Sequence, residues 1–552
     1  MPSSAPSGRL VLVPVPARRG RGREGLGVET PSCPRYCWVV ETPTSPGREA
    51  FQVKSRANFE RRQRSIEARL DPRWQPERTE PVLEGGNITY EVSGRTEAIR
   101  GGGLGMLQAV VEVAGLREQI DGRLHLLRRH LPYHESDHVL ALVYNLLVGG
   151  RCLEDLELRR SDEGFLNALG AHRLPDPTTA GDFLRRFKAA DVLTLMEAIQ
   201  QARSAVWRVQ PATERKLAIL DVDGTISETS GECKERMDIS YDGRWGYGPL
   251  VVSLANSQEV LYVVNRPANR PSHDGAAEWI DRGIKWARTG GGFEGVRLRG
   301  DTDFSLTENF DRWTEEGVEF VFGMDANPSF VGRAKALAEE CWKLLERPES
   351  LAKRRRPVNV KKAVTEQRGF RNLELEHEHV AEIEYRPSKC QRSYRLVILR
   401  KRIQVTEGQL RLADEIRYFF YITNIPRERL GTAAVVRENN ARCHQENLIE
   451  QLKNEVHATR MPVAEFDANW AYLVIASLAW NLKAWSGLLL PRKLGARAIL
   501  RMEFRRFLNE LILLPAQILR SGRRLIFRLL AINPWVPLLL DGTRALKRRL
   551  LA

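Results

Sequence analysis

The spacing of apolar residues along the chain changes near residue 215, and the change predicts two kinds of structure. Between residues 90 and 212, apolar positions recur every three or four residues, as at Leu104, Leu107 and Val111. This spacing is typical of helices that bury one face. We therefore expect residues 90–212 to form a helical domain.

Beyond residue 215, short runs of branched apolar residues alternate with helical segments. Strands are predicted at 217–220, 250–254 and 260–264, up to Arg299 and at 318–323, with helices at 275–288 and 306–316. Three strands followed by alternating helices and strands favour an α/β core with a mixed sheet. We assign residues 215–345 and 427–488 to this core.

The core is interrupted and flanked by segments of other composition. Residues 350–426 form a second β-rich block, with strands predicted at 380–385, 394–398 and 416–423. Residues 489–552 are predicted to be a basic helical region, either a helix pair that contacts DNA or another copy, or an amphipathic helix open to solvent. Residues 1–85 are rich in Pro, Gly, Ser and Arg, which predicts a disordered basic extension.

The charge of the chain narrows the choice of partners. Lys and Arg number 85 against 70 Asp and Glu, a net charge of +15. Such a balance favours association with polyanions, above all nucleic acid, and says nothing about the fold. The helical domain at 90–212 is therefore a candidate DNA-binding domain. A helix-turn-helix reader of DNA and a plain helical packing domain both remain open there.

Cysteine and histidine usage points away from disulfides and zinc. Seven scattered cysteines fit a reducing compartment. No apolar run reaches the roughly 18 residues that a membrane span needs, so we expect a cytoplasmic protein without a membrane partner. His125, His130, His134 and His138 recur every four or five residues, and we expect them on an exposed helix face.

Three short stretches place carboxylates where metal chemistry could use them. They are Asp221-Val222-Asp223-Gly224-Thr225, Arg299-Gly300-Asp301 and Arg442-x3-Glu446-x6-Lys453. The first two follow predicted strands, and the third has the spacing of one helix face. Three acidic ligands are what a two-metal phosphodiester-cleaving site needs, and Mg²⁺ prefers such oxygen ligands.

Two families share parts of this pattern. Asp221-Val222-Asp223-Gly224-Thr225 resembles the D-x-D-G-T motif of haloacid-dehalogenase-like phosphatases, in which Asp221 would be the nucleophile. The run from 215 to 485 resembles DDE transposases of bacterial insertion sequences, family thirteen-eighty within the group that carries a Y-x2-R-x3-E-x6-K signature. The further matching stretches are Gly246-Tyr247-Gly248-Pro249-Leu250, Asn265-Arg266-Pro267-Ala268-Asn269, Phe466-Asp467-Ala468-Asn469-Trp470 and Ala479-Trp480-Asn481-Leu482.

The transposase resemblance implies a fold and a site. The fold would be an RNase H-like α/β catalytic core interrupted by the β-rich insertion, with the helical N-terminal domain and the basic C-terminal region attached. Asp223, Asp301 and Glu446 would be catalytic and would hold Mg²⁺, with Mn²⁺ as a substitute. Arg442 and Lys453 would bind DNA. The gap from 301 to 446 is 446 − 301 = 145 residues, too long for a loop and filled by the insertion.

The resemblance also implies what the protein does. It would cut double-stranded DNA at the ends of its own element and transfer them to a target, as a homodimer or larger complex. The tyrosine of the signature falls on Asn439, a departure that keeps a second hypothesis open, a DNA-binding relic without catalysis. Asp221 and Glu446 separate the two enzymes, because only the phosphatase needs Asp221 and only the transposase needs Glu446.

Overall fold

The computed structural model describes residues 46–70, 97–130, 132–346, 371–407, 410–411, 414–521 and 524–551. The chain divides into two units, Met1–Gln75 and Pro76–Ala552. In the first unit, helix α1 (Pro46–Leu70) lies inside the segment expected to be disordered. Pairs four residues apart, such as Arg56 with Glu60 at 3.1 Å, support this helix without an apolar stripe. The rest of the expected extension lies outside the described residues.

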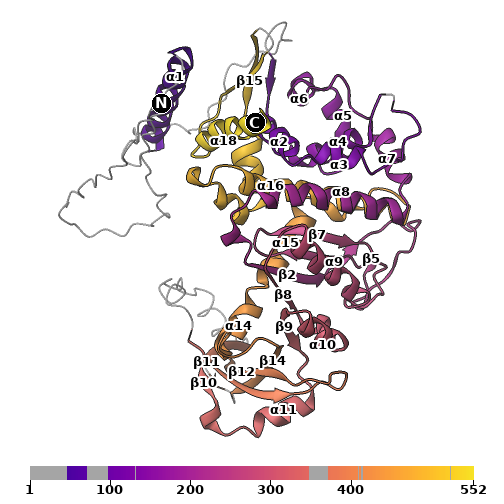
Figure 1. Cartoon of the computed structure of the whole chain (residues 1–552), viewed down its shortest axis with the longest axis vertical. Coiled ribbons are helices and arrows are strands. Elements are labelled where there is room, and N and C mark those ends of the chain that lie inside the picture. Colours follow the sequence, from indigo (N-terminus) through magenta and orange to yellow (C-terminus); the bar gives the residue numbers. More distant parts are fainter. Residues whose placement is uncertain are drawn as a thin grey trace, which may run out of the picture. The chain divides into compact units, whose positions relative to one another are not determined.

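The second unit is built on one large mixed sheet with the strand order β10-β11-β12-β14-β9-β8-β2-β6-β7 (Figure 1). Its central strands are β2 (Leu217–Gly224), β6 (Leu250–Leu254), β7 (Glu259–Val264), β8 (Gly295–Gly300) and β9 (Val318–Met324). The first three form an antiparallel meander, and β8 and β9 run parallel to β2. The predicted mixed sheet and the predicted strands in this region are confirmed.

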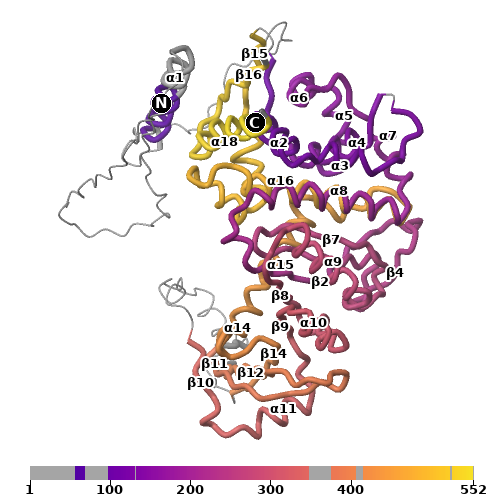
Figure 2. Tube along the Cα trace, viewed as in Figure 1, coloured from indigo at the N-terminus to yellow at the C-terminus, as the bar shows by residue number. Residues whose placement is uncertain are grey.

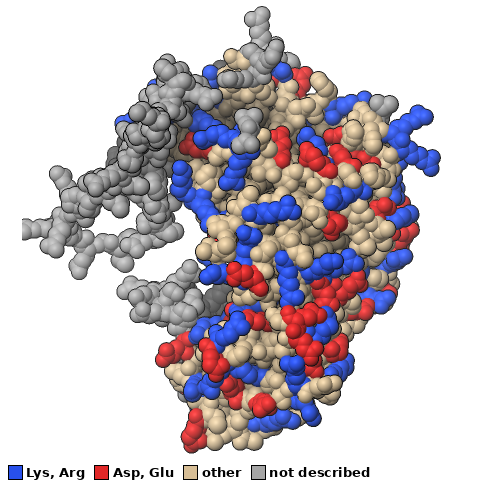
Figure 3. All heavy atoms as spheres, viewed as in Figure 1, with Lys and Arg blue, Asp and Glu red and all other residues tan. Residues whose placement is uncertain are grey.

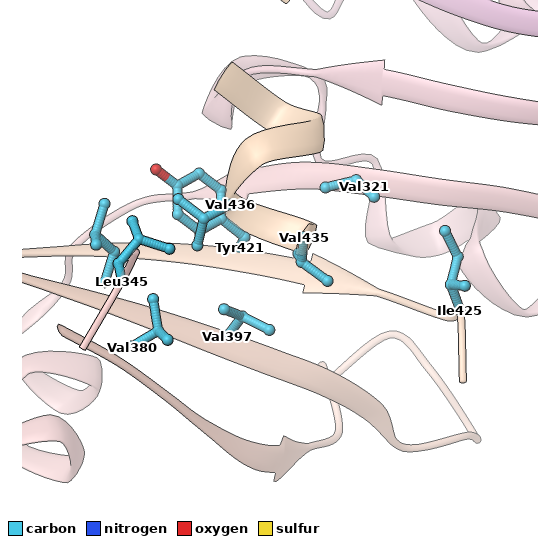
Figure 4. Close-up of a cluster of buried hydrophobic side chains, with 9 residues drawn as sticks. Val321, Leu345, Val380, Val397, Tyr421, Ile425, Val435 and Val436 are labelled. Carbon is cyan, nitrogen blue, oxygen red and sulfur yellow. The ribbon is translucent and has the colours of Figure 1, made fainter. Parts of the chain in front are cut away.

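The β-rich insertion continues the same sheet. Strand β14 (Glu415–Thr423) pairs antiparallel with β9, and β12 (Tyr394–Glu407) joins β14 to β11 (Arg371–Tyr385). One face of these strands packs under α14 (Thr432–Asn440) through nine buried side chains, eight of them labelled in Figure 4: Val321, Leu345, Val380, Val397, Leu399, Tyr421, Ile425, Val435 and Val436. The insertion therefore anchors the helix that leads into the third acidic motif.

Helices cover the core on the side of β7. They are α2 (Leu104–Val113), α3 (Leu116–Asp121), α4 (Glu135–Leu147), α5 (Asp155–Arg160), α6 (Glu163–Leu169), α7 (Pro177–Arg185) and α8 (Ala189–Arg208). The long helix α16 (Phe466–Leu489) contacts α2, α4, α7, α8 and β7. Nearly all of its residues are buried, so these N-terminal helices share one core with α16 and the sheet.

A buried ion pair ties α8 to the sheet. Glu259 on β7 and Arg203 on α8 are both fully buried, with Arg203 Nε 3.0 Å from Glu259 Oε1. The indole nitrogens of Trp207 and Trp485 also donate to Glu259, at 2.8 and 2.7 Å. Because α8, β7 and α16 all contribute, this network fixes how the helices sit on the sheet.

The C-terminal region departs from the predicted helical tail. Strands β15 (Ala516–Ser521) and β16 (Arg524–Leu529) form a hairpin, and β15 pairs with β1 (Glu97–Ile99). Helix α18 (Val536–Leu551) follows and contacts α2. The prediction of helix throughout 489–552 is therefore wrong, because the pairing of β15 with β1 and β16, and not a local alternation of apolar and polar residues, sets the structure here. Of the helices in the described ranges, none combines the length and apolar character that crossing a bilayer requires.

Candidate active site

Sheet topology brings the first two acidic motifs together. Asp223 lies near the end of β2, and Asp301 follows directly after β8. These strands are parallel neighbours with Asp221 opposite Arg299, so their carboxyl ends meet at one edge of the sheet. Helix α15 (Cys443–Asn454) carries Glu446 and contacts β2. Figure 2 shows these segments, remote in sequence, close to one another.

One guanidinium lies among all three predicted catalytic carboxylates. Arg442, the N-cap residue of α15, places Nη1 2.9 Å from Asp223 Oδ2. Its Nη2 lies 3.4 Å from Glu446 Oε1 and 3.8 Å from Asp301 Oδ2. The Arg442 side chain is only 13% exposed, whereas that of Glu446 is 59% exposed. The four residues singled out from three separate motifs therefore form one charged cluster.

The environment of the two aspartates disfavours their charged forms. Burial raises the pKa of Asp223 to about 7, against the lowering effect of Arg442 and with a smaller raising effect from Asp301. Burial also raises the pKa of Asp301, although Arg442 again opposes the shift. Carboxylates that share one guanidinium also repel each other, and the positive charge of Arg442 offsets this repulsion.

Asp221 has a different role from Asp223. Its side chain is 1% exposed, and Arg299 donates to both of its oxygens, from Nε at 2.6 Å and Nη2 at 2.7 Å. Arg299 Nη1 also lies 3.4 Å from Glu438 Oε1 on α14. Because the Asp221 carboxylate is both buried and held by this bidentate pair, it is not accessible to a substrate. Asp221 therefore ties β2 to β8, and Asp223 is the acid that faces the pocket.

A pocket of about 330 Å³ lies beside the cluster. Its lining residues come from the end of β2, the turn after it and one face of α15, namely Asp223, Gly224, Thr225, Glu446, Ile449, Glu450, Lys453 and Asn454. Lys453 Nζ donates to the carbonyl of Ile226 at 2.8 Å, and burial lowers the pKa of Lys453. Sequence reasoning missed Glu450, although its place four residues after Glu446 puts it on the same helix face.

The donor set suits a hard divalent cation, because it contains carboxylate oxygens only. Among the described residues, no three acidic, His or Cys side chains are gathered closely enough to hold a metal ion directly. The cation that the three carboxylates share is the guanidinium of Arg442. The residues therefore fit a divalent metal in the chemistry of their donor atoms, while the guanidinium of Arg442 occupies the position between them.

Comparisons with known proteins give the family. Residues 81–550 match the family model described as transposase DDE domain group 1. The chain belongs to this family. No curated protein matches it. A cryo-EM structure of a piggyBac transposase synaptic complex with hairpin DNA shows 12% identity and a TM-score of 0.31, covering 76% of this chain and 84% of that chain. That likeness is too distant to support an argument.

The family match also decides between the two resemblances. It spans the β-rich insertion and α15, which the phosphatase motif leaves unexplained. In addition, Arg299 engages both oxygens of Asp221, the residue that a phosphatase would use as its nucleophile. Both findings contradict the phosphatase interpretation. The chain is thus a DDE transposase, and the roles of its individual residues are taken up below.

Proposed function

We propose that this transposase cleaves duplex DNA at the ends of its own element and joins the freed ends to target DNA. Asp223, Asp301 and Glu446 are the proposed catalytic residues. The observation that carries the proposal is their convergence on Arg442 from β2, the end of β8 and α15. Three acids brought to one point at a sheet edge suit phosphoryl chemistry better than a structural role, because their repulsion disfavours the folded state.

In this proposal, Asp223, Asp301 and Glu446 would hold Mg²⁺, or Mn²⁺ in its place. The metal, when bound, would activate a water or 3′-hydroxyl and neutralise charge on the phosphate oxygens. Glu446 is the most exposed of the three, so it can adjust its position with little cost. The buried position of Asp223 excludes water from one side of the site, which strengthens the electrostatic interactions there.

Arg442 and Lys453 are proposed to bind the phosphate backbone next to the scissile bond. Arg442 presents a planar donor fork that matches a phosphate, and Lys453 lines the pocket beside Asp223. Lys453 at present donates to the carbonyl of Ile226 and lies 3.3 Å from the hydroxyl of Thr225. It therefore holds the turn after β2 and directs an ammonium toward the pocket, both of which help to position DNA.

Two further parts of the proposal rest on the sequence motifs. From the matching stretches we propose that the protein belongs to family thirteen-eighty of the insertion-sequence transposases. Joining two element ends requires two sites held together, so we propose a homodimer or larger complex on DNA. The relic hypothesis arose from Asn439, whose side-chain oxygen is buried without a hydrogen-bond partner among the described residues. The experiment below decides between the relic and the active enzyme.

The test is cleavage of a labelled duplex that carries the flanking ends of the gene, with Mg²⁺ and without it. Wild type is compared with Glu446→Gln, and Glu278→Gln is the matched control. Glu278 is 64% exposed on α9 (Ala276–Thr289), away from the acidic cluster. We expect nicking at the element boundary in wild type and in the control, with a loss of at least about 100-fold in Glu446→Gln.

Other results of this cleavage experiment would also decide between the hypotheses. Binding of the duplex without cleavage in all three proteins would favour the relic. Full cleavage by Glu446→Gln would show that Glu446 is not a catalytic residue. In that case Glu450→Gln becomes the next variant, because Glu450 lines the same pocket one helical turn later.

A further inference from the structure

The loop between α3 and α4 is built around a buried carboxylate. Glu135, at the start of α4, is 1% exposed, and its Oε1 accepts the backbone N–H groups of Leu126 and Leu127, both at 2.9 Å. Its Oε2 lies 3.1 Å from Nε2 of His130. Buried carboxylates with three polar partners hold their surroundings rigidly. Residues 122–130 thus form a fixed loop, which we call the arginine loop.

The histidines in this region do not form the exposed helix face that their spacing predicted. His130 and His134 stack at 4.4 Å between ring centroids, and His134 is the N-cap of α4. His138 is buried and stacks on Phe183 of α7 at 4.3 Å. That expectation is wrong, because the chain before Glu135 is a loop and because His138, on α4, is buried against α7.

The loop presents arginines that form no ion pair with an acidic residue in the described part of the chain. Arg123, Arg128 and Arg129 are exposed, and Arg123 donates only to Gln119, at 2.6 Å. Two exposed arginines from other segments lie against the same region. Arg173 donates to the hydroxyl of Tyr133 at 3.2 Å, and Arg186 reaches the carbonyl of Leu126 at 3.5 Å.

Several exposed arginines of this region are not matched with acids among the described residues. Elsewhere in the described part of the chain, many exposed arginines are matched with acids, as Arg282 is with Glu278 at 2.9 Å. None of the five arginines around the loop forms an ion pair with a described acidic residue. Figure 3 shows Lys and Arg side chains gathered over the α3–α4 connection and α7. Unpaired guanidinium groups on a rigid support are the groups that bind phosphate most readily.

We infer that the arginine loop, with Arg173 and Arg186, binds the phosphate backbone of duplex DNA. The inference rests on the proposed function and adds to it the surface by which the helical domain holds DNA. Its partner is duplex DNA, because a regular double helix presents phosphates at the repeating spacing that a fixed array of guanidiniums can match. Phosphate contacts position a protein without reading sequence. The loop should therefore bind all duplexes with similar affinity, and other residues would recognise the sequence.

The test measures how the DNA affinity of the double variant Arg128→Gln/Arg129→Gln depends on salt concentration, in comparison with wild type. The probes are a fluorescent duplex from the gene's flanking ends, a random duplex of equal length and a single-stranded RNA. The control, Arg282→Gln/Arg288→Gln, removes the same charge from α9. At about 0.1 M salt we expect the loop variant to bind both duplexes roughly 10- to 100-fold more weakly, with the slope of log affinity against log salt reduced by about 2.

The outcomes separate this inference from the proposed function. If wild type binds neither duplex, the proposed function fails and the inference fails with it. If wild type binds and the loop variant matches it in affinity and slope, only the inference is overturned. Equal weakening in the control variant would also overturn it, by showing a general effect of net charge. If wild type binds the RNA more tightly than either duplex, and the loop variant loses this RNA binding, then the partner of the loop is RNA and not DNA. The inference is supported if only the loop variant, and not the control, binds both duplexes more weakly than wild type.

Discussion

Arg442 Nη1 lies 2.9 Å from Asp223 Oδ2, so the arginine predicted to hold DNA is also the counter-ion of the acid predicted to hold metal. The same guanidinium approaches Asp301 and Glu446. A phosphate that binds Arg442 would draw it away from these acids and leave them to a divalent cation. DNA binding and metal binding should therefore favour each other.

The first prediction follows from this competition. Arg442→Gln removes the guanidinium that a metal ion must displace, so we expect the DNA-free variant to bind Mn²⁺ about tenfold more tightly than wild type. The measurement is a titration of free Mn²⁺ by electron paramagnetic resonance, which needs no catalytic activity. Arg282→Gln, on the exposed face of α9, should leave the affinity unchanged. Weaker Mn²⁺ binding in Arg442→Gln would mean that the arginine holds the acids in place for the metal.

A second prediction separates the two aspartates of β2. Asp221→Asn leaves Arg299 buried without its full counter-charge, which should cost about 3–5 kcal/mol of stability. Asp223→Asn should change stability little. Burial raises the pKa of Asp223 to about 7, against the lowering effect of Arg442 and with a smaller raising effect from Asp301, so the neutral form is already accessible at neutral pH. Thermal unfolding of both variants at neutral pH measures the difference. Equal melting temperatures would contradict the structural role of Asp221.

Much of the core could be predicted because its signals are local. The apolar runs that became β2, β6, β7, β8 and β9 differ clearly from the helical spacing around them. The choice between Asp221 and Asp223 could not be predicted from spacing, since residues two apart in a strand share a face. The partner that separates them, Arg299, comes from the neighbouring strand. Tertiary pairing of this kind leaves no trace in the local pattern.

The same limit explains the other differences. The convergence on Arg442 depends on the parallel pairing of β2 with β8 and on α14, which the insertion anchors. In the C-terminal region, β15 is stabilised by β1, more than 400 residues earlier by chain number, 516 − 99 = 417. Its sequence shows no strict alternation of apolar and polar residues and does not indicate a strand when it is considered alone. Pairing across such a distance outweighs local preference.

A third prediction concerns the network that joins α8, β7 and α16. Glu259→Gln leaves Arg203 fully buried beside a neutral amide, which should lower stability by about 3–5 kcal/mol. Trp207 and Trp485 would also lose their charged acceptor. Differential scanning fluorimetry measures the loss, with the exposed Glu278→Gln as the control that should stay within about 0.5 kcal/mol. A change as small as the control's would show that the helices sit on the sheet through apolar packing alone.

The last prediction uses a lysine inside α16. Lys483 is 1% exposed, its ammonium lies 4.0 Å from the centre of the Trp480 ring, and burial lowers its pKa to about 7. In the unfolded chain its pKa returns to about 10.4, so the unfolded state binds the extra proton between these values. Stability should therefore rise with pH from about 7 to about 10, and the penalty is complete below pH 7.

Lys483→Met should remove that penalty. We expect the variant to be more stable than wild type by roughly 3–5 kcal/mol at neutral pH, with the gain shrinking toward zero near pH 10. The measurement is the melting temperature of both proteins across this pH range. Because the cation–π contact with Trp480 offsets part of the penalty, the gain should lie below the full value that the pKa shift implies. A gain that does not vary with pH would show that Lys483 has the same pKa in the folded and unfolded states, and that Met simply packs better.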